Sequence, residues 1–279
     1  MPPQWAMTPT EPSSPPGVVS EGSDLVKKID TADGLLAGLD FDGTLAPIRA
    51  DPETPALSPQ LEELLNRLAS QQHVRVVVIS GRALADLADR IPVPGVDLAG
   101  NHGLELRLDG ERRVPERVEQ HLPEVREALE SLRADLDGVP GIRIEDKQLS
   151  LTVHVRETPP NHVDGVRETV KRIVADSPGL TLSEGKQVFE VKPAVSLDKG
   201  TAMQRFERET PTEWLSLYLG DDTTDEDAFR AIQPDGIGVH VGERGDTAAG
   251  YRILEQSDVP DFLSWLTART SISEEPGTS

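Results

Sequence analysis

The stretch LLAGLDFDGTLAP, residues 35–47, decides the fold of this chain. Its apolar first half is typical of a buried strand, and that strand ends at two aspartates, Asp40 and Asp42. Burying a carboxylate is costly unless a partner compensates it. Residues two apart at a strand end project to the same side, and Gly43 permits a sharp departure of the chain. The stretch therefore predicts a functional edge of a sheet.

Segments on both sides of this strand alternate apolar runs with amphipathic stretches. Before residue 109 the spacing predicts a helix over 58–71, with Ser58 as N-cap, a strand over 74–80, a helix over 82–91 and a strand over 97–103. From residue 198 it predicts a helix over 198–209, a strand over 214–222, a helix over 226–232 and a strand over 236–242. Such alternation favours a parallel sheet covered by helices.

Between these halves the pattern changes to a helix followed by two strands, and this unit occurs twice. The predicted elements are a helix over 114–136, strands over 142–147 and 149–156, a helix over 161–176, and strands over 180–184 and 187–192. We therefore expect an α/β fold with a Rossmann-like parallel sheet core, residues 24–108 and 194–268, interrupted by an inserted α+β cap over 109–193. Residues 1–23 and 269–279 are expected to be a disordered arm and a disordered tail.

Composition limits the partners. The 279 residues include 28 Lys and Arg against 49 Asp and Glu, a formal net charge of −21, which argues against a nucleic-acid surface. No cysteine is present, which excludes disulfides and thiolate sites. No apolar run approaches the ~20 residues of a membrane span, and the N-terminal stretch lacks the basic start and apolar centre of a signal peptide. We expect a cytoplasmic protein with no membrane partner. An anionic substrate would need local attraction or a bound cation.

Three strand ends carry polar residues, at 39–44, 78–82 and 218–227. In open parallel sheets, ligands bind outside the carboxyl ends of the strands. The side chains expected to converge there are Asp40, Asp42, Ser80, Asp221, Asp222 and Asp225. So many carboxylates repel one another without a cation, and oxygen donors of this kind favour Mg²⁺.

This set of residues suits phosphoryl chemistry. Asp40 can attack phosphorus to form an aspartyl phosphate, while Asp42 protonates the leaving oxygen and then activates water. Ser80 lies near a predicted helix N-terminus, a favourable position for an anion, and Lys199 can neutralise the attacking carboxylate. Structural alternatives remain: Ser80 as a plain helix cap, Lys199 as a solvated surface residue, and the acidic run 221–227 as charge at a helix N-terminus. An EF-hand starting at Asp40 is excluded by its sixth and twelfth residues.

Four motifs occur in order: DFDGT at 40–44, ISGR at 79–82, DKG at 198–200 and GDDTTDE at 220–226. Together they resemble the signature motifs of haloacid dehalogenase-like phosphatases, and the resemblance covers about residues 33–265. It implies Asp40 as nucleophile and Asp42 as general acid and base, with Ser80 and Lys199 holding the phosphoryl group. It also implies that magnesium is bound by the Asp40 carboxylate, the Asp42 carbonyl and Asp221, supported by Asp222 and Asp225. Asp198 stands where this family would have serine.

Three further segments narrow the resemblance to trehalose-6-phosphate phosphatases: GNHGLELR at 100–107, IEDKQLSLTVHVR at 144–156 and GKQVFEVKP at 185–193. The last two lie in the predicted cap, which in this family selects the substrate. The resemblance implies magnesium-dependent hydrolysis of trehalose 6-phosphate, a small sugar phosphate, to trehalose and phosphate.

Alternation along the predicted cap strands gives one apolar face and one face rich in charged donors and acceptors, which suits sugar hydroxyls. The candidate substrate-binding residues are Thr44, Arg82, Asn101, His102, Glu145, Lys147, Lys186 and Glu190. The alternative is that this charged face only meets water. Two other functions also stay open: a phosphatase for another sugar phosphate, such as sucrose phosphate or a mannosyl phosphoglycerate, and a regulatory sugar-phosphate-binding protein without catalysis.

Overall fold

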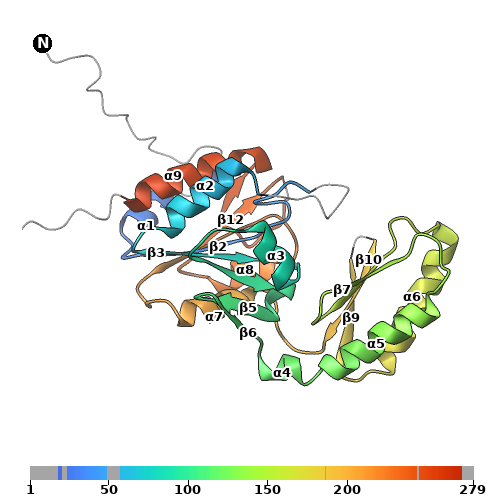
Figure 1. The fold of residues 1–279 in the computed structure, drawn as a ribbon. Coiled ribbons are helices and arrows are strands. Elements are labelled where there is room, and N and C mark those ends of the chain that lie inside the picture. The colour runs from blue at the N-terminus through green and yellow to red at the C-terminus, as the bar shows by residue number, and fades with distance from the viewer. Residues whose placement is uncertain (1–17, 21–23, 49–56, 186, 244, 272–279) are drawn as a thin grey trace, which may run out of the picture. The chain divides into compact units, whose positions relative to one another are not determined.

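The structure is a computed structural model that describes residues 18–20, 24–48, 57–185, 187–243 and 245–271. The chain divides into two compact units, and Figure 1 labels elements of both. The first unit comprises Met1–Val77, Pro92–Val96 and Met203–Ser279, and the second comprises Val78–Ile91 and Asp97–Ala202. The sequence predicts an inserted cap that begins at residue 109 and ends at residue 193. The division into compact units does not test these limits, so they stay a prediction.

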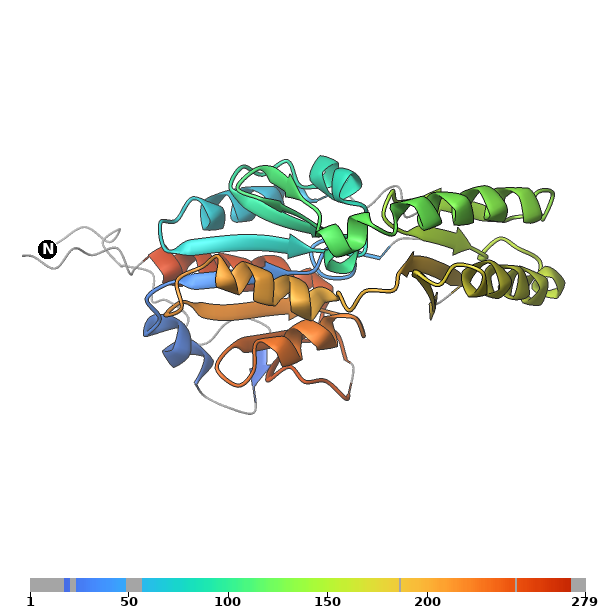
Figure 2. The ribbon, with the colours of Figure 1, turned by 90° about the horizontal axis from the view of Figure 1, so that it is seen from below.

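The first unit is built on a largely parallel sheet, visible as the long strands in Figure 2. Its elements are β1 (Val18–Ser20), α1 (Leu25–Asp30), β2 (Leu35–Leu39), α2 (Pro59–Ala69), most of β3 (Val74–Ile79), most of α7 (Lys199–Arg208), β11 (Leu215–Gly220), α8 (Asp225–Ala231), β12 (Ile237–Val241), β13 (Tyr251–Ile253), η2 (Gln256–Asp258) and α9 (Val259–Ser271). The strand order is β1-β13-β12-β11-β2-β3. β11 runs parallel to both β2 and β12, and every residue of β2 is buried, as expected.

Helix α2 shows how sequence signals set an element of this unit. The Ser58 hydroxyl accepts a hydrogen bond from the Leu61 amide at 3.2 Å, and Pro59 occupies the first helical position. The leucines predicted to share one helical face are buried. Figure 1 shows α2 beside α9, and the Gln71 amide group donates to the Thr267 carbonyl oxygen at 2.8 Å.

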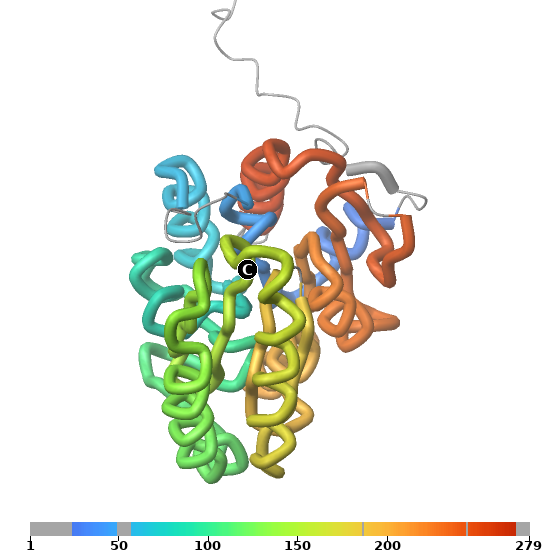
Figure 3. Tube along the Cα trace, turned by 90° about the vertical axis from the view of Figure 1, so that its right-hand side faces the viewer, coloured from blue at the N-terminus to red at the C-terminus, as the bar shows by residue number. Residues whose placement is uncertain are grey.

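The second unit combines a β-hairpin with an antiparallel α+β half. Its elements are α3 (Leu84–Arg90), most of β4 (Val96–Gly100), η1 (Asn101–Gly103), β5 (Glu105–Leu108), β6 (Glu111–Arg113), α4 (Glu116–Glu119), α5 (Leu122–Asp135), β7 (Arg143–Asp146), β8 (Leu151–His154), α6 (Pro160–Ala175), β9 (Leu180–Gly185) and β10 (Val188–Pro193). The order β7-β8-β10-β9 is antiparallel throughout. Helices α5 and α6 run side by side in Figures 1 and 3 and share an apolar core with this sheet.

The predicted mixed α/β class is confirmed, with differences in single elements. The helix expected over 114–136 is divided into α4 and α5, because Pro123 lacks an amide hydrogen and suits the first turn of a new helix. Residues 18–20, expected in the disordered arm, form β1 and pair with β13. Helix α9 continues to Ser271, so the first three residues of the expected tail are helical. The rest of the arm and tail lies outside the described residues.

No helix in the described part of the chain combines the length and the apolar character needed to cross a membrane.

Candidate functional site

Three carboxylates meet at one end of the parallel sheet in the first unit. Asp40 directly follows β2 and Asp221 directly follows β11; these strands are parallel with Leu39 opposite Leu219. The Asp40 amide donates to the Leu219 carbonyl oxygen at 2.8 Å, which continues the pairing to the strand ends. Asp225 opens α8. Carboxylate oxygens of Asp40, Asp221 and Asp225 all lie within 4.8 Å of one another.

The Asp225 side chain organises the loop after β11. One of its oxygens accepts hydrogen bonds from the amides of Asp221 and Asp222, at 3.0 and 2.9 Å. The other accepts from the Tyr218 hydroxyl at 2.8 Å. Burial, followed by the nearby carboxylates, raises the pKa of Tyr218 well above its usual value, so this hydroxyl stays a donor. Tyr218 was not among the predicted site residues; its signal is a hydroxyl within an otherwise apolar strand.

Asp221 is held from the side of the first motif. The buried Thr44 hydroxyl donates to its carboxylate at 3.2 Å. Gly43 has φ +94°, and a Cβ atom there would lie 2.2 Å from an Asp221 oxygen. A Cβ atom at Gly220 would similarly lie 2.3 Å from the Asp225 carboxyl carbon. Only glycine at both positions leaves room for the two carboxylates.

This donor set fits a hard divalent cation, because three carboxylates this close repel one another unless a cation neutralises them. Among the described residues, Asp42 and Asp222 are not part of the group of three. Asp42 forms a bridge with Ala46. The exposed Asp222 carboxylate accepts from the Thr223 amide and hydroxyl, at 2.6 and 3.0 Å.

The second unit contains the turn after β3. Ser80 is buried, and its hydroxyl oxygen accepts from the Arg82 amide at 3.2 Å. The Ser80 and Arg82 carbonyl oxygens accept from the amides of His102 and Asn101, at 2.9 and 2.7 Å. This places the predicted residues of two segments together. Lys199, the first residue of α7, is also buried in this unit.

Arg82 is oriented by an acidic residue one helical turn away. Asp86 accepts from Arg82 at 2.9 Å and from Arg90 at 2.9 Å. Burial acts to raise the pKa of Asp86, but hydrogen bonds from Arg90 and Arg82 hold it below its usual value. Asp86 therefore stays ionised and keeps Arg82 in place.

Cap residues of the predicted set gather around the same turn. The Lys147 ammonium donates to the Gly81 carbonyl oxygen at 3.0 Å and lies 3.8 Å from a Glu190 oxygen. His102 Nε2 lies 3.7 Å from that oxygen. Burial, together with the charges of Lys199, Lys147 and Lys192, lowers the pKa of His102 well below its usual value. The imidazole is therefore neutral near pH 7.

Glu145 and His154 form a neighbouring pair across β7 and β8, with 2.7 Å between His154 Nε2 and the carboxylate. This hydrogen bond lowers the pKa of Glu145, although burial acts against it. The alternate residues Leu151 and Val153 are buried, which confirms the apolar face predicted for this strand. Lys186 lies outside the described residues.

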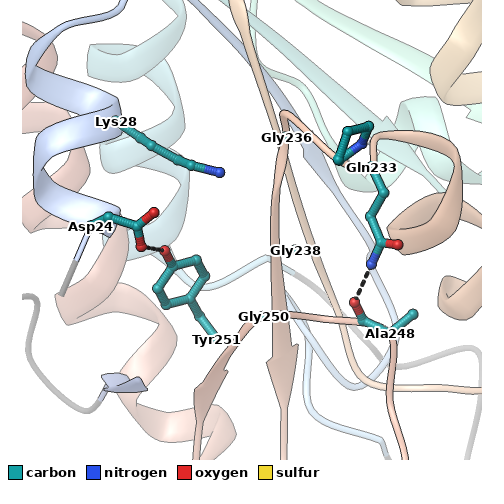
Figure 4. Close-up of a pocket in the computed structure, with 9 residues that line it drawn as sticks. Asp24, Lys28, Gln233, Gly236, Gly238, Ala248, Gly250 and Tyr251 are labelled. Carbon is teal, nitrogen blue, oxygen red and sulfur yellow. Dashed lines mark hydrogen bonds between the residues drawn. The ribbon is translucent and has the colours of Figure 1, made fainter. Parts of the chain in front are cut away.

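A cavity of about 360 Å³ lies elsewhere in the first unit (Figure 4). Lys28 and Tyr251 line it, and the Tyr251 hydroxyl donates to Asp24 at 2.6 Å. Gln233 donates to the Ala248 carbonyl oxygen at 2.7 Å beside it. None of the predicted site residues line this cavity.

A family model described as Trehalose-phosphatase matches residues 38–256. The chain belongs to the trehalose-phosphatase family. It is 33% identical over 267 residues to the trehalose-phosphate phosphatase of Mycobacterium ulcerans, which covers 91% of this chain and 68% of that protein. This member of the trehalose-phosphatase family is thus a phosphatase, as its motifs predict.

Solved structures of two proteins share the fold of this family member. One, a trehalose-6-phosphate phosphatase related protein, matches with a TM-score of 0.76 and 24% identity, over 86% of this chain and 100% of that one. The other, a haloacid dehalogenase-like hydrolase from Bacteroides thetaiotaomicron, matches with a TM-score of 0.59 and 16% identity, over 83% and 99%. They confirm the predicted haloacid dehalogenase-like fold.

Proposed function

We propose that this phosphatase hydrolyses trehalose 6-phosphate to trehalose and phosphate with magnesium, through a phosphorylated Asp40. The observation that carries the proposal is the grouping of Asp40, Asp221 and Asp225 in a chain of the trehalose-phosphatase family. The name of the Mycobacterium ulcerans relative supports the choice of substrate.

In the first step a carboxylate oxygen of Asp40 attacks the phosphorus atom, and the bond from phosphorus to the sugar oxygen breaks. The protonated Asp42 carboxyl gives its proton to the departing sugar oxygen, so trehalose leaves neutral. In the second step Asp42, now ionised, takes a proton from water as the water oxygen attacks phosphorus. The bond from phosphorus to Asp40 breaks, which releases phosphate and restores both carboxyl groups.

Ser80 and Lys199 are proposed to hold the phosphoryl oxygens. A buried ammonium is an effective partner for a dianionic group, since water does not screen it. Thr44, whose hydroxyl donates to Asp221, is proposed to bind the substrate as well, since its hydroxyl oxygen can still accept a hydrogen bond. Magnesium, held by Asp40, Asp221 and Asp225 with the Asp42 carbonyl, would offset the phosphate charge and the mutual repulsion of the carboxylates.

The sugar is proposed to bind to Glu145, Lys147, Lys186, Glu190, Arg82 and His102. Carboxylates accept hydrogen bonds from hydroxyls, and ammonium groups donate to them. The neutral imidazole of His102 can do either at Nε2, because one ring nitrogen carries the hydrogen. The cytoplasmic location and the expectation of no nucleic-acid partner stay predictions from the sequence.

The covalent step is tested by rapid quenching of ³²P-labelled trehalose 6-phosphate with excess enzyme. The wild type should carry acid-stable label when magnesium is present, and Asp40→Asn should neither carry label nor release phosphate. The matched control is Asp227→Asn, because this exposed carboxylate on α8 is outside the group of three. Full turnover by Asp40→Asn would contradict the mechanism.

Substrate choice is tested with a panel that includes trehalose 6-phosphate, sucrose phosphate, mannosyl phosphoglycerate and p-nitrophenyl phosphate. Trehalose 6-phosphate should have the highest kcat/KM. Glu190→Ala should impair the sugar phosphate far more than p-nitrophenyl phosphate, which has no sugar to recognise. A different preferred sugar would replace the proposed substrate, and binding without phosphate release would favour a regulatory protein.

A further inference from the structure

A buried acidic residue lies beside the turn at residues 80–82 of the second unit, and the proposed chemistry does not use it. Glu105, on β5, is 3% exposed. One of its oxygens accepts from the Leu84 amide at 3.0 Å and from the Asn101 side-chain amide at 2.8 Å. The other accepts from Arg112 Nε at 2.9 Å and forms an ion pair with the guanidinium at 2.8 Å. Both oxygens are therefore committed within the protein.

Glu105 completes the start of α3. Leu84 is the first residue of this helix, and the N-cap residue Ala83 offers no side-chain hydrogen bond. The first amides of a helix lack partners within it, and a carboxylate there is also favoured by the helix dipole. Glu105 supplies that partner from strand β5. It therefore fixes the point at which the segment after Ser80 and Arg82 enters helix α3.

Asn101 carries the same connection toward the cap. Its side-chain amide donates to Glu105 and, at 3.3 Å, to the Lys147 carbonyl oxygen, while its side-chain oxygen accepts from the Ser150 hydroxyl at 2.7 Å. Asn101 is 2% exposed, and its φ of +51° is an unusual backbone conformation outside glycine. A side chain with both donor hydrogens engaged inside the protein is poorly placed to bind a sugar.

These bonds join three turns, at residues 80–82, 101–102 and 147–150. The backbone amide of Asn101 donates a hydrogen bond to the Arg82 carbonyl oxygen, and the Lys147 ammonium donates one to the Gly81 carbonyl oxygen. We infer that Glu105, acting through Asn101, is a positioning residue that sets Lys147 and Arg82 for the sugar phosphate. This assigns Asn101 a positioning role in place of the direct substrate contact expected from the sequence. The inference rests on the proposed function only in that Lys147 and Arg82 contact substrate.

Loss of this connection should act on the sugar phosphate selectively. Lys147 is proposed to contact the sugar, which p-nitrophenyl phosphate lacks. A displacement of about 1 Å in a substrate-positioning group can cost on the order of 100-fold in rate. Glu105→Ala and Asn101→Ala should each lower kcat/KM for the sugar phosphate about 10- to 100-fold, mainly through KM, and lower that for p-nitrophenyl phosphate much less.

Conservative replacement separates this role from general stability. Glu105→Gln keeps a side-chain carbonyl oxygen for Leu84 and Asn101. It replaces the other oxygen by an NH2 group, so the hydrogen bond and the ion pair with the solvent-accessible Arg112 side chain are lost. It should restore most of the activity lost in Glu105→Ala. The double variant of Glu105→Ala and Asn101→Ala should be hardly worse than either single variant, because the two residues act as one unit.

The experiment measures steady-state kinetics with p-nitrophenyl phosphate and with whichever sugar phosphate the wild type hydrolyses best. If that sugar phosphate is not trehalose 6-phosphate, the proposed substrate is wrong, but the positioning role of Glu105 is still tested. Ser150→Ala serves where Glu105→Ala folds poorly, and it should raise KM for the sugar phosphate about 3- to 10-fold. Its control is Thr158→Val, since the buried Thr158 hydroxyl has no hydrogen-bond partner among the described residues. Equal losses on both substrates, additive effects, or no rescue by Glu105→Gln would each overturn the inference.

Discussion

Replacing Tyr218 by phenylalanine tests how the carboxylate group is held together. The ring is fully buried in β11 and packs edge-on against Phe229, with centroids 5.6 Å apart. Phenylalanine fills the same space, so Tyr218→Phe removes only the hydroxyl that donates to Asp225 at 2.8 Å. The variant therefore isolates one hydrogen bond.

The structure sets the size of the effect. A hydrogen bond to a charged group contributes about 1.5–3 kcal/mol, and here its loss leaves a buried carboxylate oxygen with one partner fewer. The same carboxylate also orders the amides of Asp221 and Asp222, so its rotation would move a second proposed metal ligand. Loss of a partner that orients a ligand typically costs 10- to 100-fold in metal affinity. We expect about 1.5–3 kcal/mol less unfolding free energy and at least about tenfold weaker magnesium binding.

Urea unfolding in a chelator measures the first quantity, and magnesium titration by calorimetry measures the second without relying on turnover. The matched control is Tyr251→Phe, which removes the only other tyrosine hydroxyl of the chain, one that donates to Asp24 beside the separate cavity. The control should bind magnesium like the wild type. If Tyr218→Phe bound magnesium as tightly as Tyr251→Phe does, the hydroxyl would not be holding Asp225 in a working geometry.

Three further variants probe other contacts. Gly43→Ala puts a Cβ atom 2.2 Å from Asp221 at φ +94°, so it should cost about 1–3 kcal/mol of stability and weaken magnesium binding, as urea unfolding and calorimetry would show. Because burial and three lysines lower the pKa of His102 well below 6.5, the unfolded chain takes up a proton below that pH that the folded chain does not, and stability falls as the pH drops. His102→Gln should therefore flatten the slope of unfolding free energy below pH 6.5, by at most about 1.4 kcal/mol per pH unit. Asp86→Ala frees Arg82, so KM for the sugar phosphate should rise about tenfold with little change in kcat, and an unchanged KM would remove Asp86 from the substrate side.

The parts of the site that the sequence predicts are those fixed by one local rule. Asp40 and Asp221 each end an apolar run, and parallel neighbouring strands bring such ends together regardless of the remaining fold. Thr44 belongs to the same motif as Asp40, DFDGT, and was predicted together with it. The structure adds that its hydroxyl donates to Asp221. The α/β class follows from the same alternation of strands and helices.

The sequence does not predict the residues that act by forming hydrogen bonds with other site residues. Glu105 looks like a surface position in a short apolar segment, and only the hairpin of β5 and β6 brings Arg112 to it. The residue spacing does not show that the Leu84 amide bonds to an acceptor far away in sequence. It does so because Ala83, at the N-cap position, has no side chain that could accept this hydrogen bond. Tyr218 is hidden for the same reason, because an apolar strand tolerates a tyrosine in any case. Partners far apart in sequence leave no periodic signal.

The charge distribution explains how so acidic a chain can bind a phosphate. The net charge of −21 would repel a dianion at long range, and the 0.15 M salt of a cell screens that repulsion beyond about 8 Å. At short range the second unit presents the opposite field, since Lys199, Lys147 and Lys192 add to the effect of burial and lower the pKa of His102 further. The neutral histidine adds no positive charge of its own, so the positive charge near it comes from the lysines. The long-range field therefore affects the rate of encounter, while affinity is proposed to depend on these nearby cations, of which Lys199 is buried and Lys147 and Lys192 are half-buried, so added salt should change substrate binding less than the net charge alone suggests.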